Sequence, residues 1–372
     1  MLAATVIEYL TRNWALVVIV LTIATLVIVP TFVFLKYVPI ALNIMRSTKD
    51  LPLARNPLDF ERLSGEHVSF SAYDGVRLTG MLIPAAEGTQ RRGMILFAHE
   101  FGADLYSCAR YCRPLRDAGY EIFTFDFRGH GQSGCDPKYT PRQWVTEREV
   151  YDMRGALAYV GELLRERGHS TEIGVMGVSR GACAAILSAT ECDRIVAMVC
   201  DGVYSTDNCV EYFMRRWAYI FAKVRLVYEN HHPAFWRVLR CLMLRFAERE
   251  FGCKFPSVRK ALMRLSPRPI AFIHGERDSY LPIEQGRLLY ALAPQPKSFW
   301  AVPRAKHNQA VIVQPERYAR LTIELFNRYL AKLDLPASPS AQPREMSTDS
   351  IAAPPPATRS QIANADESGL HA

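Results

Sequence analysis

The chain has 372 residues, of which 49% are hydrophobic and 22% are charged, and its formal net charge is +8. This balance is typical of a globular protein and excludes a wholly disordered chain, a collagen-like repeat and a coiled coil. Residues 203–268 hold 13 Lys/Arg and 5 Asp/Glu, so this stretch alone accounts for the net charge. The sequence contains no zinc-finger spacing, helix-turn-helix signature or RNP-type aromatic run, and we therefore expect no nucleic-acid partner.

The cysteine pattern indicates reduced thiols. There are nine cysteines, an odd number, scattered through the chain rather than arranged as a short disulfide framework. Cys108 and Cys112 lie four residues apart, but no second pair is placed to complete a zinc site. We therefore predict no metal ion and no cofactor.

Residues 1–49 are predicted to form a membrane anchor. Residues 13–35 carry no charge, and a helix over about 14–35, at about 1.5 Å per residue, spans the roughly 30 Å hydrocarbon core. Trp14 and Tyr37 lie at the two ends, where interfacial aromatic residues are typical. A cleaved signal peptide is the alternative, but the apolar run is long and no small-residue cleavage site follows it.

The flanking charges predict an orientation. Arg12 is the only Lys or Arg before the apolar run, whereas Lys36, Arg46, Lys49 and Arg55 follow it. The single apolar run predicts one membrane crossing, and by the positive-inside rule the body of the protein, which follows the run, lies in the cytoplasm.

Residues 333–372 are rich in Pro, Ala and Ser and hold few large apolar residues. Such a composition predicts a disordered tail. The folded domain is therefore expected over residues 59–332.

Within residues 59–332 the pattern alternates between strand and helix, which predicts an α/β domain with a mostly parallel sheet. The first two strands meet at Asp74-Gly75, a hairpin signal. The others are near-continuous apolar runs, as expected for parallel strands buried on both faces. The predicted strands are 67–72, 76–84, 94–99, 121–127, 172–177, 195–202, 269–275 and 298–303. The predicted helices are 105–118, 143–167, 180–189, 283–292 and 315–330.

The long interval 203–268 is predicted to be a helical insertion that caps one edge of the sheet, because a structureless loop of that length is improbable in a compact domain. Its basic and aromatic residues allow two interpretations. A plain lid would pack its aromatic residues on the sheet and leave its arginines solvated or paired with acids. Alternatively, the residues near Arg215, Arg216, Trp217 and Lys223 would contact anionic lipid.

Residues 177–181, Gly-Val-Ser-Arg-Gly, match the pattern G-x-S-x-G between a predicted strand and a predicted helix. That context is typical of a nucleophile elbow, a sharp turn that holds a serine hydroxyl at the carboxyl edge of the sheet. Gly177 and Gly181 would let the helix pack close to the strand. The alternative is a tight turn in which Ser179 only caps a helix.

A nucleophilic serine needs a base, and the base needs an acid that orients it. His307 and Asp278 follow predicted strands, so both are expected in loops at the carboxyl edge of the sheet. Their order in the chain, serine then acid then histidine, suits this architecture. Asp201 and Glu276 are competing acids, and an ordinary loop histidine and a turn-forming aspartate are the other interpretations.

The chain resembles the α/β-hydrolase fold superfamily and is similar to its esterase, dienelactone-hydrolase and serine-aminopeptidase-like branches. The resemblance covers about residues 66–330 and implies Ser179 as nucleophile, Asp278 as acid and His307 as base. The matching segments are AHEFG (98–102), DFRGHGQS (126–133), GVSRG (177–181), HGERDSYLP (274–282) and His307.

The resemblance also implies an oxyanion hole formed by the backbone N–H groups of Arg180 and Phe101. Glu100 stands where members of the family usually have glycine, which puts the geometry of this loop in question. A carboxylate there would also oppose the oxyanion unless it points away. We interpret His99, His130 and His274, which precede glycines or lie in the family motifs, as structural.

These observations predict a membrane-anchored serine hydrolase that cleaves an acyl ester, thioester or amide of a small-molecule or lipid-like substrate. Two alternatives stay open. One is an acyltransferase that uses the same three residues. The other is a catalytically inactive binding protein, which Glu100 favours. The oligomeric state is not predicted.

Overall fold

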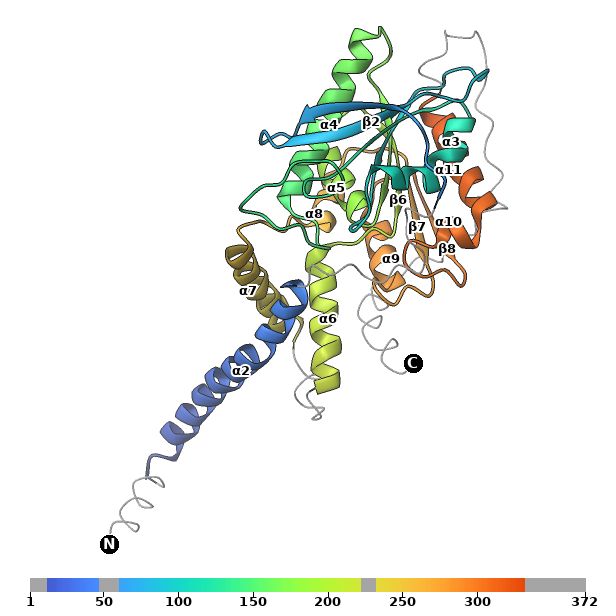
Figure 1. Cartoon of the computed structure of the whole chain (residues 1–372). Coiled ribbons are helices and arrows are strands. Elements are labelled where there is room, and N and C mark those ends of the chain that lie inside the picture. The colour runs from blue at the N-terminus through green and yellow to red at the C-terminus, as the bar shows by residue number, and fades with distance from the viewer. Residues whose placement is uncertain (1–11, 47–59, 222–231, 332–372) are drawn as a thin grey trace. The chain divides into compact units, whose positions relative to one another are not determined.

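The computed structural model describes residues 12–46, 60–221 and 232–331. The predicted disordered tail lies outside these residues. The described body is built on one eight-stranded sheet with the order β1-β2-β4-β3-β5-β6-β7-β8 (Figure 1). The strands are β1 Glu66–Ser71, β2 Arg77–Ile83, β3 Met94–Ala98, β4 Glu121–Phe125, β5 Ile173–Val178, β6 Ile195–Asp201, β7 Ile270–Gly275 and β8 Lys297–Val302.

The pairing of the strands follows the sequence patterns. Strands β1 and β2 form the antiparallel hairpin that Asp74-Gly75 predicted, and β2 also pairs antiparallel with β4. Every other pair in the sheet is parallel. The prediction of a mostly parallel α/β sheet is therefore confirmed, and all eight predicted strands are present with small shifts at their ends.

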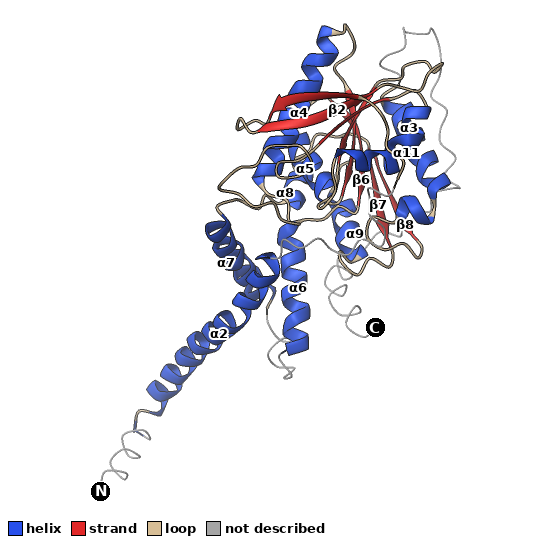
Figure 2. Ribbon diagram, in the orientation of Figure 1, coloured by secondary structure: helices blue, strands red, loops and turns tan. Residues whose placement is uncertain are grey.

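Helices cover both faces of the sheet (Figure 2). One apolar cluster joins the sheet to α4, α5 and α9, and a second joins its other face to α3 and α11. Parallel strands need this double cover because both of their faces are apolar. The helices of the body are η1 Leu105–Ser107, α3 Cys108–Asp117, α4 Glu147–Glu166, α5 Arg180–Ala189, α9 Ile283–Leu292, α10 Ala310–Val313 and α11 Pro315–Tyr329.

The start of α4 corrects the predicted helix 143–167. The helix begins at Glu147, four residues later, because Thr146 is its N-cap. The Thr146 hydroxyl accepts from Arg148 N, and the Glu149 carboxylate accepts from Thr146 N, which together form a capping box. The signal T-x-x-E is present in the sequence, and it marks the true boundary.

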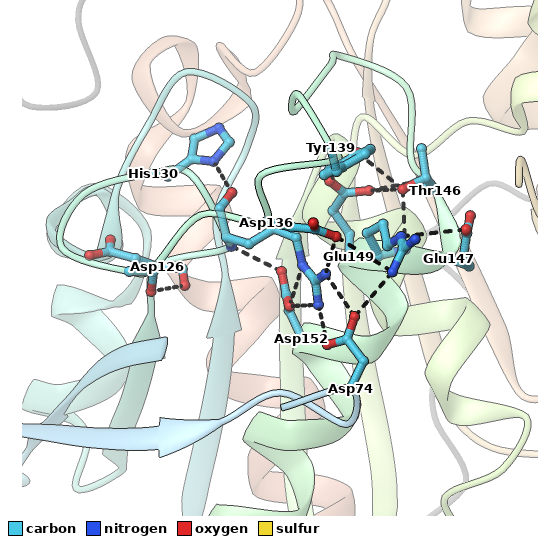
Figure 3. Close-up of polar contacts among 12 residues, drawn as sticks. Asp74, Asp126, His130, Asp136, Tyr139, Thr146, Glu147, Glu149 and Asp152 are labelled. Atoms are coloured by element: carbon cyan, nitrogen blue, oxygen red, sulfur yellow. Dashed lines mark hydrogen bonds and ion pairs between the residues drawn. The ribbon is translucent and has the colours of Figure 1, made fainter. Parts of the chain in front are cut away.

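A buried arginine fastens the hairpin to α4. The side chain of Arg128, in the loop after β4, is fully buried and donates to Asp152 of α4 at 2.6 Å and to Asp74 of the β1–β2 turn at 2.7 Å. Figure 3 shows Asp74 and Asp152 close together within this network of polar contacts. Because a buried charge is costly without partners, the two carboxylates fix the position of the loop.

The interval between β6 and β7 contains the helices α6 Thr206–Phe221, α7 Pro233–Phe251 and α8 Val258–Leu262. In α6 the side chain of Arg215 donates to Glu211 at 2.9 Å. The side chain of Trp217 and the whole of Lys223, both named in the lipid-contact interpretation, lie outside the described residues.

The predicted anchor forms a single helix, α2, over Trp14–Arg46. Among the residues that the structure describes, no helix is both long enough and apolar enough to cross a bilayer. The transmembrane segment at about 14–35 therefore stays a prediction.

Candidate active site

The G-x-S-x-G segment forms the sharp turn that its glycines predicted. Ser179 directly follows β5 and precedes α5, and its φ of 51° and ψ of −115° lie outside the regions that non-glycine residues favour. Such strain costs of order 1–3 kcal/mol and persists only where the surroundings enforce it. A side chain at Gly177 would come within 2.5 Å of Ala182 Cα, and one at Gly181 within 2.2 Å of the Ala98 carbonyl oxygen.

Three residues that are far apart in the sequence form a continuous hydrogen-bonded chain at the carboxyl edge of the sheet. The distance between Ser179 Oγ and His307 Nε2 is 2.9 Å, and that between His307 Nδ1 and Asp278 Oδ2 is 2.6 Å. Because a carboxylate only accepts, Nδ1 carries the ring proton in the neutral imidazole, and Nε2 accepts from the serine hydroxyl. The arrangement can therefore move the hydroxyl proton to His307.

Backbone donors hold Asp278 in place. Its Oδ1 accepts hydrogen bonds from Tyr280 N and Leu281 N, both at 2.9 Å, which leaves Oδ2 for His307. Burial by itself would raise the pKa of Asp278, but His307, His274 and the Leu281 N–H outweigh it, and the pKa lies below its ordinary value. The carboxylate is therefore negatively charged at neutral pH.

The carboxylate in turn changes the basicity of His307. Burial would lower the pKa of this imidazole, but the charge of Asp278 and its hydrogen bond raise the pKa above the ordinary histidine value. Asp201 and Glu100 contribute in the same direction when they are ionised. His307 is thus a stronger base than an exposed histidine.

The competing acids have other surroundings. The Asp201 carboxylate is buried and accepts from Tyr318 Oη at 3.1 Å, and burial raises its pKa to about 7. Its backbone carbonyl accepts from Ser179 N at 2.7 Å, so Asp201 supports the elbow through the main chain. Glu276 is exposed. Of the three acids, only Asp278 contacts His307 through its side chain.

Arg180 and Phe101, the expected oxyanion donors, lie close together. The buried guanidinium group of Arg180 lies 4.9 Å from the centroid of the Phe101 ring and donates to His130 Nε2 at 3.2 Å and to the Arg142 carbonyl. Arg180 therefore supports the loop after β3 with its side chain, in addition to presenting the first N–H of α5.

Glu100 points into the protein rather than toward solvent. It is buried, and its Oε1 accepts from Tyr111 Oη at 3.0 Å. Burial raises the pKa of this carboxyl, which favours its neutral form. Both features reduce the repulsion that we expected between the Glu100 carboxylate and an oxyanion.

The three motif histidines have structural partners. His99 accepts from Phe127 N and donates to the Glu100 carbonyl, and His130 donates to the Arg128 carbonyl. Burial and the nearby Arg180 lower the pKa of His130 to about 3, so its ring is neutral. His274 lies nearest to the chain of three, with its Nε2 3.6 Å from Asp278 Oδ2 and bonded to the Leu281 carbonyl.

Sequence reasoning missed two residues that border His307. A side chain at Gly202 would come within 3.0 Å of His307 Cε1 and 2.9 Å of Asn308 Oδ1, and Gly202 has a φ of 63°. Asn308 is buried with a φ of 55°, and its carbonyl accepts from Arg110 Nη2 at 2.6 Å. The available signals were a glycine directly after a strand and an asparagine, a residue that tolerates positive φ.

No metal centre accompanies this site in the described part of the chain, where no three His, Cys, Asp or Glu side chains are grouped to hold an ion.

Residues 95–321 match the model of the alpha/beta hydrolase family, and the chain belongs to that family. It is 25% identical over 273 residues to YqkD of Bacillus subtilis, covering 70% of this chain and 82% of that one. It is 23% identical over 250 residues to the protein Bem46 of Schizosaccharomyces pombe, covering 66% and 72%. Among solved structures, the esterase Pf2001 of Pyrococcus furiosus shares the fold, with a TM-score of 0.53, 23% identity, and coverage of 77% of this chain and 97% of that one.

Proposed function

We propose that the protein is a serine hydrolase that cleaves an acyl ester, thioester or amide through an acyl-enzyme on Ser179. Its main support is the hydrogen-bonded chain from Ser179 Oγ through His307 to Asp278, with distances of 2.9 and 2.6 Å. The strained conformation of Ser179 adds to this support, because strained residues concentrate at active sites.

In the proposed mechanism, His307 Nε2 accepts the proton of Ser179 as Oγ attacks the acyl carbon. The backbone N–H groups of Arg180 and Phe101 donate to the oxyanion of the tetrahedral intermediate. When this intermediate collapses, His307 returns the proton to the leaving alcohol, thiol or amine. Water then attacks the acyl carbon while His307 takes a proton from it, and His307 returns that proton to Ser179 Oγ as the bond to the serine breaks and the carboxylic acid leaves.

A substrate-class panel tests this proposal. The full-length protein in mild detergent is assayed with p-nitrophenyl esters of several chain lengths, an acyl thioester and an acyl anilide, with Ser179→Ala as the matched control. We expect hydrolysis of at least one class by the native protein only. If the folded native protein turns over none of them, the inactive binding protein is the better description. Acyl transfer to an added alcohol or amine in preference to water would define an acyltransferase.

We also propose that α2 attaches the enzyme to a membrane, with the body on the cytoplasmic side. The support is the uncharged run over residues 13–35 together with apolar side chains of α2 that are more than half exposed, among them Trp14, Leu26 and Phe32. Carbonate extraction of membranes tests the attachment. We expect the full-length protein to stay in the pellet, whereas recovery in the supernatant with a shortened N-terminus would indicate a cleaved signal peptide instead.

A further inference from the structure

Helix α7 has two apolar faces. Its buried face consists of Trp236, Leu239, Met243, Ala247 and Phe251. On the other side of the helix, Val238 is 60% exposed, Leu242 39% and Phe246 44%, and these residues are spaced four apart. Outside α2, the only other large hydrophobic side chains exposed in the described residues are those of Tyr73 and Met263. Exposed apolar residues scattered singly are ordinary, but a stripe along one helix marks an interaction surface.

Arginines border this stripe. Arg245 lies three residues after Leu242, and Arg249 lies three residues after Phe246, so each is next to the stripe on the helix surface. Both are exposed and form no ion pair with a described residue.

The acids of α7 are already neutralised. Glu248 pairs with Lys254, and Glu250 pairs with Arg46 at 2.5 Å. The exposed face of α7 is therefore both apolar and positively charged.

The same helix is tied to α2. Val38, Leu42 and Met45 of α2 are buried in one apolar cluster with the inner face of α7. Arg46 also donates to both carboxylate oxygens of Glu250. The exposed stripe of α7 thus belongs to the same part of the molecule as the exposed apolar side chains of α2.

We propose that the outer face of α7, formed by Val238, Leu242, Phe246, Arg245 and Arg249, lies in the interface of a bilayer that contains anionic lipid. The apolar side chains enter the boundary between headgroups and acyl chains, and the two arginines contact lipid phosphates. A basic helix with an apolar stripe is the combination that binds such a surface. This contact adds α7 to the residues near Arg215 and Lys223 for which the sequence suggests a contact with lipid.

A fluorescent label at position 242 tests the contact in the full-length protein. The cysteines that are not buried are replaced (Cys135→Ser, Cys192→Ser and Cys241→Ser), and an NBD group is attached to Leu242→Cys. The control label is on Glu87→Cys, in an exposed turn of the body. Both proteins are reconstituted into phosphatidylcholine vesicles with and without about 30 mol% phosphatidylglycerol, with brominated lipid as quencher.

We expect brominated lipid to quench the label at 242 but not the one at 87, with more quenching in the anionic vesicles and less as salt screens the charges. Arg245→Gln with Arg249→Gln should weaken the contact roughly fivefold for each arginine removed. If the label at 242 is quenched no more than that at 87 at low salt, α7 does not touch lipid. If quenching at 242 does not depend on phosphatidylglycerol or on the arginines, the anionic-lipid contact is wrong.

This contact is independent of catalysis. No step of the experiment uses a substrate, so its failure leaves the hydrolase proposal standing, and a failed substrate panel leaves the lipid contact standing. Far-ultraviolet circular dichroism of each variant excludes unfolding as the cause of lost quenching.

Discussion

The side chains at the carboxyl edge of the sheet have partners within the protein, whereas apolar side chains on the outer face of α7 are exposed to solvent. At the sheet edge, Ser179, Asp278 and His307 are held by short hydrogen bonds, and both carboxylate oxygens of Asp278 have partners. On α7, Val238 and Leu242 lie in solvent without the cover that apolar side chains find inside the protein. The side chains of the first region find their hydrogen-bond partners within the chain. For the second region, we propose that a lipid surface covers the exposed side chains.

Of the variants that test this difference, Ser179→Ala is expected to have the largest effect on activity. Removing one oxygen deletes the proposed nucleophile, so kcat should fall by roughly 10⁴- to 10⁶-fold. The melting temperature should change little because the substitution is small. A loss of less than tenfold would mean that the sheet edge does not act through Ser179.

Asp278→Asn is expected to cost nearly as much, roughly 10⁴-fold in kcat, because an amide would hold the wrong tautomer of His307. Asp201→Asn is the matched control, since that carboxylate is also buried near the site but bonds to Tyr318. It should reduce kcat far less. The reverse ranking of the two variants would show that Asp201 is the acid.

Gly202→Ala should reduce kcat by about 10²-fold, because a methyl group there would displace His307 from its contact with Ser179. Gly168→Ala is its control. Gly168 has a similar φ of 68°, but a side chain there would meet nothing within 4 Å. Both variants should lose some thermal stability through backbone strain, and only Gly202→Ala should lose activity. Equal activity in the two would remove Gly202 from the site.

The smallest expected effect is a shift in the pH dependence of kcat/KM. His307 must be neutral to accept the serine proton, so kcat/KM should rise as pH rises through its pKa. Because Asp278 raises that pKa, the acid limb of the profile should lie at a higher pH than an ordinary histidine would give. The residual activity of Asp278→Asn should show an acid limb moved to lower pH, as pH–rate profiles of the two proteins would reveal. An unmoved limb would assign it to another group.

Much of the fold could be predicted from the sequence. The apolar runs predicted eight strands because parallel strands are buried on both faces, and Asp74-Gly75 predicted the hairpin. The start of α4 was predicted too early because the apolar pattern begins before Thr146. The capping box at Thr146 decides where the helix begins.

The sequence predicts those parts of the candidate site that a local pattern specifies. It does not predict the parts that depend on contacts between distant segments. A strand, G-x-S-x-G and a helix specify the turn at Ser179, and loops after strands placed Asp278 and His307. Which acid faces His307 depends on side-chain directions at two neighbouring strand ends, which chain order does not specify. The direction of Glu100 and the closeness of Gly202 to His307 depend on packing between distant segments. The lipid-facing stripe of α7 was missed because its apolar residues looked in sequence like ordinary core.

The most direct test of the proposed function is covalent labelling of the folded, full-length protein with a fluorophosphonate, followed by mass spectrometry of its peptides. An activated serine beside a base reacts with such a probe far faster than an ordinary hydroxyl does. We expect a single adduct on Ser179, absent from Ser179→Ala and strongly slowed in His307→Ala. A folded protein that carries no adduct on Ser179, or one that is labelled equally fast without His307, would contradict a serine hydrolase built on these three residues.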